Sequence, residues 1–303
     1  TLTGLMNGTL SLNATSVDDL SLVGQIDVTS LSAGGAVLNG DTFSTSKFSL
    51  PLDVRRSLIN SSPHVNVKTL KILIDQGEIS VTADAPQASL IAAGELLPAS
   101  INSALLGAAP VSPITFSGAA GNASVGLDLD LAAVVKQLPK TAALAQGVTL
   151  TSGRLRHTTQ LTFQPESVLL VTSTQLPDLA GTNNGRAVKL SPIDLSATVT
   201  ALAGARPDLR DVRFTLKSDF ANVNGGGPAL GQQEWKGSLD LTTLRAQLDQ
   251  FVDVNALLAD EPTEPSTTAL PVELAGRAEF VFNMNGDVTQ PGGAIGTALQ
   301  LGL

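Results

Sequence analysis

The chain has no cysteine and no tyrosine, and only 3% of its 303 residues are aromatic. Without cysteine it has no disulfide bond, no thiolate nucleophile and no cysteine ligand for a metal. Trp235 is its single tryptophan. Leucine, valine, isoleucine and alanine must therefore supply most of the packing in a chain that is long enough to bury a substantial core.

Basic residues are few and scattered. The net charge is −9, from 18 lysine and arginine residues against 27 aspartate and glutamate residues, and the longest basic run is Arg55–Arg56. Nucleic-acid binding depends on clusters of lysine and arginine that neutralise phosphates. We therefore predict no nucleic-acid partner.

Long hydrophobic runs are also missing. A membrane-spanning helix needs about 18 or more consecutive apolar residues, and the sequence has no such run. The first residue is Thr1, without a methionine or the apolar core of a signal peptide. We expect a mature protein or a fragment, with any anchor or signal peptide outside the given segment.

Apolar and polar residues alternate along most of the chain, which is typical of strands with one apolar face. The alternation is clear in residues 70–74 and 79–83, and Asp75-Gln76-Gly77 between them predicts a hairpin turn. It recurs in residues 155–163, 211–220 and 277–284. We predict a mainly β fold with a few short helices, built from long antiparallel strands with one apolar face.

Three segments lack this alternation and predict helices: 89–107, 131–147 and 242–258. The last two follow "LDLAAV" and "LDLTTL", two copies of a hexapeptide that leads in each case to Gln-Leu. A third copy, "IDVTSL" at 26–31, leads into a predicted loop, so we interpret it as a coincidence. We expect Asp130 and Asp240 to be structural and to tolerate asparagine. Residues 224–231 and 259–271 predict exposed loops.

Candidate catalytic groups are isolated. His64 follows Ser61 and Ser62 in a predicted loop without the strained turn that exposes a nucleophile, and His157 lies alone on a predicted strand. Asp128 and Asp130 alternate onto the solvated face of a strand, which favours a structural role over paired catalytic carboxylates. We predict no catalytic site, no metal site and no cofactor, and hence a protein that is not an enzyme.

Residues 120–258 resemble the AsmA-like family. The resemblance lies in "GLDLDLAAVVKQLP", "GVTLTSGRLRHTTQLTF", "LPDLAGTNNGRAVKLSP", "LRDVRFTLKSDFANVNGGG" and "GSLDLTTLRAQLDQFVDV". It implies a strongly curved, elongated β-groove with an apolar inner face. It also implies the periplasm or cell envelope of a diderm bacterium, an anchor outside the given segment, and a role in moving phospholipid between membranes or supporting outer-membrane assembly. Phospholipid or another acyl-chain lipid would be the ligand, and envelope membrane proteins are further candidate partners.

The resemblance also indicates how the chain is organised. We expect a single elongated β-groove domain over residues 1–303, or a fragment of a larger one, with repeat units near 20–125, 126–236 and 237–303. Apolar residues on the predicted strands should line the groove through non-directional contact with acyl chains. They are Ile72, Ile74, Ile79, Val81, Leu155, Leu161, Phe163, Val212, Phe214, Leu216, Phe280, Phe282 and Met284.

Other readings remain open from the residues alone. Two or three helices are too few to cover a sheet of about 15 strands, so curvature, a second sheet or acyl chains must cover the apolar face. A surface-exposed structural or adhesive β-solenoid is the alternative function, although its coils of about 20–25 residues disagree with a hexapeptide interval of roughly 105 residues. A carbohydrate-active enzyme that uses Asp128 and Asp130 is a third, disfavoured by the scarcity of aromatic residues.

Overall fold

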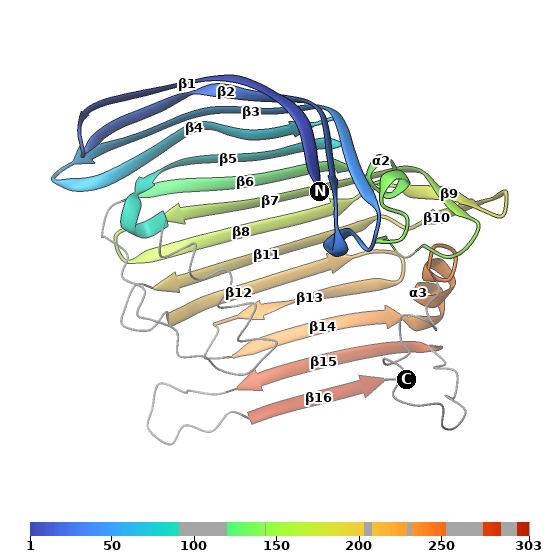
Figure 1. The fold of residues 1–303 in the computed structure, drawn as a ribbon. Helices are drawn as coiled ribbons and strands as arrows, with labels where there is room; N and C mark the ends of the chain where they lie inside the picture. The colour runs from blue at the N-terminus through green and yellow to red at the C-terminus, as the bar shows by residue number, and fades with distance from the viewer. Residues whose placement is uncertain are drawn as a thin grey trace.

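The computed structural model describes residues 1–90, 120–142, 144–202, 208–228, 232–252, 275–285 and 296–302. They form one large antiparallel sheet that is not closed, with short helices at its margin (Figure 1). The predicted mainly β fold of long antiparallel strands is confirmed. The predicted helix 89–107 and the predicted loop 259–271 lie almost entirely or entirely outside the described residues.

The first eight strands are β1 (Leu2–Ser16), β2 (Asp19–Gly34), β3 (Thr42–Ile59), β4 (Ser62–Ile74), β5 (Gly77–Pro86), β6 (Gly121–Asp130), β7 (Val148–Phe163) and β8 (Ser167–Leu176). The others are β9 (Leu179–Asn183), β10 (Arg186–Leu190), β11 (Ile193–Leu202), β12 (Asp208–Lys217), β13 (Ala221–Gly227), β14 (Gln233–Asp240), β15 (Arg277–Asn285) and β16 (Gly296–Gly302). The helices with both ends in the described residues are η1 (Ala36–Leu38), α2 (Leu131–Gln137) and α3 (Leu241–Leu248), and residues 87–90 are also helical.

Neighbours in sequence are neighbours in the sheet, with one exception. The order runs from β1 to β8 and then from β11 to β16, while β9 and β10 leave this path as a hairpin that pairs with β7. The turn of that hairpin is Asn184-Gly185, and both residues have positive φ, as a tight two-residue hairpin turn requires. This hairpin contains the "DLAG" and "NGR" motifs. The hairpin predicted at Asp75-Gln76-Gly77 also forms, between β4 and β5.

Four sequence predictions are corrected. The helix predicted over 131–147 ends at Gln137, because Pro139 follows closely and cannot continue it. The helix predicted over 242–258 ends at Leu248. His64 lies in β4 and not in a loop. The loop predicted over 224–231 is strand as far as Gly227, and Gly225 is required there: a Cβ atom on it would lie 2.7 Å from Trp235 Cα.

The two hexapeptide copies are equivalent strand-to-helix junctions. The carboxylate of Asp130 accepts a hydrogen bond from the Ala133 N–H at 3.0 Å, and that of Asp240 accepts one from the Thr243 N–H at 2.7 Å. Each aspartate is thus the N-cap of the helix that follows, α2 or α3. The copy at 26–31 lies inside β2, so it is not a third junction.

The glutamines of the two Gln-Leu pairs are also equivalent. Gln137 Oε1 accepts a hydrogen bond from the Ser44 N–H at 2.6 Å, and Gln247 Oε1 accepts one from the Ser191 N–H at 3.0 Å. Ser44 belongs to β3, and Ser191 comes just before β11. α2 therefore braces a strand several places away in the sheet, and α3 braces the connection between β10 and β11. The boundaries of the repeat units stay a prediction.

Replacing Asp130 with alanine should lower the free energy of unfolding by about 1 kcal/mol, since the Ala133 N–H loses its capping acceptor. Asp130→Asn keeps a side-chain oxygen at this position and should stay close to wild type. Chemical denaturation of both variants checks the prediction. Equal losses for alanine and asparagine would show that the carboxylate charge, and not the cap, is what α2 needs.

Candidate functional site

A continuous row of cross-strand partners defines one face of the sheet. Partners directly opposite each other in an antiparallel ladder point to the same side. Phe282 on β15 lies opposite Trp235, Trp235 opposite Gly225, and Gly225 opposite Phe214 on β12. The row continues from Phe214 through Ala197, Thr172, Thr159, Val125, Val81, Leu70 and Leu52 to β3. We call this side of the sheet the Phe214 face.

The register places the predicted lining residues together. Val212 and Leu216 flank Phe214 on β12, and Phe280 is two residues from Phe282. On the same face, Ile72 lies opposite Ile79, Ile74 opposite Gly77, Leu155 opposite Leu129, Leu161 opposite Leu170, and Phe163 opposite Val168. Met284 lies in β15 opposite Gln233. Residues far apart in sequence therefore share one surface.

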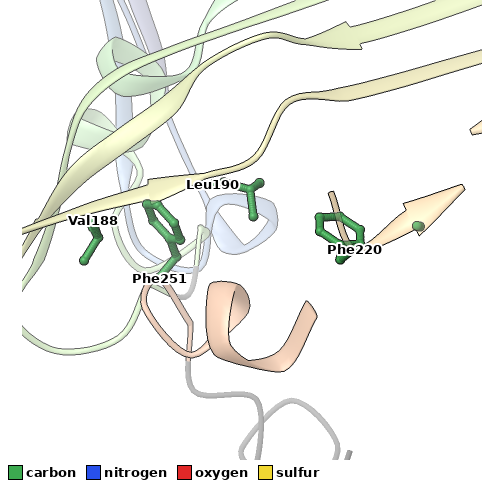
Figure 2. Packing of buried hydrophobic residues seen from close by; sticks show 5 residues of the cluster. Val188, Leu190, Phe220 and Phe251 are labelled. Carbon is green, nitrogen blue, oxygen red and sulfur yellow. The ribbon is translucent and has the colours of Figure 1, made fainter. Parts of the chain in front are cut away.

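One end of the Phe214 face is covered by α3 and the β9–β10 hairpin. Val188, Leu190, Phe220, Ala221 and Phe251 form a buried cluster there, and Figure 2 shows its larger side chains beside α3. Leu176, Ile193, Leu216 and Leu239 of the face pack against this cluster, as does Leu244 of α3. Leu244, Phe251 and Val252, all within the segment 242–258 predicted as a helix, thus help to cover the sheet, although Phe251 comes after the end of α3.

A second cluster covers the opposite end of the strands. Phe163, 1% exposed, packs with Ala85 and Val168, and Leu90 packs against them. Phe163 is therefore part of a packed core. Between the two clusters the face is more open: Ile79 is 37% and Val125 38% exposed.

A polar cluster interrupts the aliphatic residues in the middle of this face. His157 Nδ1 is 2.8 Å from Thr174 Oγ1, and His157 Nε2 is 2.9 Å from Thr159 Oγ1. Thr159 Oγ1 is in turn 3.2 Å from Thr172 Oγ1. Sequence reasoning missed this cluster, although His157 and Thr159 alternate in step with Leu155 and Leu161.

The opposite face carries paired charges. Arg154 donates to Asp128 through Nε and Nη2 at 2.6 and 2.8 Å, and this partner lowers the pKa of Asp128. Other pairs on that face are Arg213 with Asp211 and Lys236 with Glu234. Asp128 therefore forms an ion pair with an arginine and Asp130 caps a helix, so both carboxylates make structural contacts.

Two aspartates, Asp75 and Asp240, make the stability of the fold depend on pH in the acid range. The Ser46 N–H donates to the carboxylate of Asp75 and lowers its pKa below the ordinary value of 3.8, and the Thr243 N–H does the same to Asp240. A carboxyl whose pKa is lowered by folding stabilises the fold above its unfolded pKa, and this contribution is lost as the pH falls through the native value.

Denaturation at pH 7 and pH 3 should therefore show a smaller acid-induced loss of stability in the double variant Asp75→Asn, Asp240→Asn than in wild type. Each of the two asparagines keeps a side-chain oxygen that can accept the hydrogen bond described above. An equal loss in the two proteins would mean that other groups control the acid response.

Other candidate chemistry is limited in the described part of the chain. His64 Nε2 lies 2.7 Å from Asp84 Oδ1 on the neighbouring strand. Within residues whose positions are described, no three histidine or acidic side chains come close enough to hold a metal ion. Nor do those residues include a helix with the length and hydropathy needed to cross a membrane.

Comparison of the chain with models of protein families, with curated proteins and with solved structures gives no match.

Proposed function

We propose that the protein is a non-enzymatic lipid-binding protein of the bacterial envelope, and that the Phe214 face is the apolar lining of a β-groove that holds and moves phospholipid. The observation that carries the proposal is the cross-strand row from Phe282 to Leu52. Such a row offers acyl chains a long path that is apolar except at Thr159 and Thr172, and burial of acyl chains depends on area more than on geometry.

The distribution of charge supports this assignment. The ion pairs of Asp128, Asp211 and Glu234 lie on the side of the sheet away from Phe214. A surface that binds acyl chains must avoid charge, because moving a charged group out of water is costly. The open middle of the face, with Ile79 and Val125 exposed, is where a chain could lie.

Irregular pairing supports curvature. The register shifts in β1, in β3 and β4, and again in β7 and β11. Such bulges bend a strand and increase its local twist. A sheet bent in this way around the Phe214 face would form the strongly curved groove that the AsmA-like resemblance implies.

The alternative of a β-solenoid has no support from the pairing. Stacked coils of a β-helix pair in parallel, whereas every strand pair in the described residues is antiparallel. Envelope location and assembly of the outer membrane enter the proposal through the resemblance of residues 120–258.

Native mass spectrometry of protein purified without detergent tests the proposal. We expect phospholipid to be bound, and we expect the protein to speed lipid exchange between donor and acceptor liposomes. The absence of bound lipid together with exchange at the protein-free rate would refute it.

A further inference from the structure

We propose that the cluster of His157, Thr159, Thr172 and Thr174, here called the His157 cluster, binds the ester carbonyl of an acyl lipid through one of its threonine hydroxyls. The inference rests on the proposed lipid-binding function and names the polar group that the face recognises. It follows from counting hydrogen-bond donors in the cluster.

The cluster holds one more donor than it uses. A neutral histidine supplies one N–H and three threonines supply three O–H groups, which makes four donors. Only three contacts join the four side chains. One hydroxyl hydrogen is therefore unspent within the cluster, whichever ring nitrogen of His157 carries its proton.

The unspent hydrogen lies on a threonine in every arrangement. If His157 Nδ1–H donates to Thr174, then Thr159 donates to Nε2 and Thr172 donates to Thr159, which leaves the hydrogen of Thr174. If Nε2–H donates to Thr159, then Thr174 donates to Nδ1, and the bond between Thr159 and Thr172 can run in either direction, which leaves the hydrogen of Thr172 or that of Thr159. Thr159, Thr172 and Thr174 are all half-buried on the Phe214 face.

The residues around the His157 cluster favour a ligand whose hydrogen-bond acceptor is uncharged. Leu170 and Leu176 flank the two threonines along β8, and Ala197 and Leu195 lie opposite them on β11. The arginines and the lysine of the ion pairs described above, Arg154, Arg213 and Lys236, lie on the other side of the sheet. With the neutral His157 used in the donor count, a phosphate or carboxylate would sit here without a counter-ion, whereas an ester carbonyl only needs to accept one hydrogen bond.

The position of the cluster fits a lipid with chains on both sides. β7 and β8 are the central pair of the main strand order, with six strands on each side. The cluster is thus at the middle of the row, and apolar residues such as Val125 and Phe214 lie on either side of it. A lipid whose ester is held by a threonine of the His157 cluster can extend its chains along these flanks.

The test compares two lipids that differ only at this group. The purified 303-residue chain is loaded from liposomes that contain equal amounts of diacyl phosphatidylcholine and its dialkyl ether analogue, which lacks the carbonyls. Native mass spectrometry gives the ratio of the two bound lipids. We expect wild type to prefer the ester about fivefold, the size of one net hydrogen bond.

Three variants locate the effect. The variant His157→Leu, Thr159→Val, Thr172→Val, Thr174→Val removes all four donors of the cluster and should bind both lipids equally. The variant Thr159→Ser, Thr172→Ser, Thr174→Ser keeps the hydroxyls and should keep the preference. Thr158→Val, on the opposite face of β7, is the matched control and should behave as wild type. Loading without ester preference in wild type, or with preference kept in the variant that lacks all four donors, overturns the inference alone. Binding of neither lipid overturns the proposed function as well.

Discussion

Phe251→Ala is expected to lower the free energy of unfolding by about 3 kcal/mol, the low end of the usual cost of removing a buried phenylalanine side chain. Phe251 is 4% exposed and packs with Val188, Leu190 and Phe220 where α3 and the β9–β10 hairpin meet the sheet. The Ala145 N–H also donates to the Phe251 carbonyl. Because this hydrogen bond holds the backbone of the segment in place, the chain does not close the cavity that removal of the ring creates.

Chemical denaturation measures this loss, and hydrogen exchange should show that α3 and β10 lose protection first. Leu5→Ala, at a side chain that is 74% exposed on β1, is the control and should change stability by less than about 0.5 kcal/mol. If Phe251→Ala were as mild as this control, the cluster in Figure 2 would not be what holds α3 against the sheet.

The second large effect concerns lipid. Phe214→Glu combined with Phe282→Glu should weaken phospholipid binding about tenfold or more, because it puts two carboxylates into the proposed acyl-chain path. Both residues belong to the same cross-strand row, separated by Gly225 and Trp235. The ring of Trp235 lies 6.1 Å from that of Phe214, so the two changes bracket one aromatic patch.

The control places the same charges one residue along, on the other face. Thr215→Glu with Val281→Glu adds two carboxylates in the row that contains Asn224 and Lys236. Liposome exchange and native mass spectrometry should show normal lipid handling in this protein. Circular dichroism confirms that both double variants are folded. Equal lipid binding by the two variants would disprove that the Phe214 face is the binding surface.

Local patterns in the sequence were enough to predict the strands and the two helix junctions. Alternation at Ile72, Ile79, Phe214 and Phe282 depends on the two-residue period of a strand, which any neighbour in a sheet must respect. The Asp130 and Asp240 junctions depend on a hydrogen bond that spans three residues. Both signals are contained within a short stretch of chain.

The sequence did not predict which residues meet across strands. The His157 cluster joins β7 to β8, and its members are recognisable only when the register sets Thr159 opposite Thr172 and His157 opposite Thr174. Slipping one strand by a single residue would turn its side chains to the other face. No local pattern around His157 carries that information.

The sequence by itself determined the mainly β class, the alternation that gives each strand two unlike faces, and the aspartates that start α2 and α3. Only the tertiary structure decided that β9 and β10 leave the main strand order, that Phe251 and Phe163 close opposite ends of one face, and that a histidine and three threonines meet at its centre. The physical reason is distance along the chain: capping and alternation act over a few residues, whereas register and end packing join residues that only the folded sheet brings together.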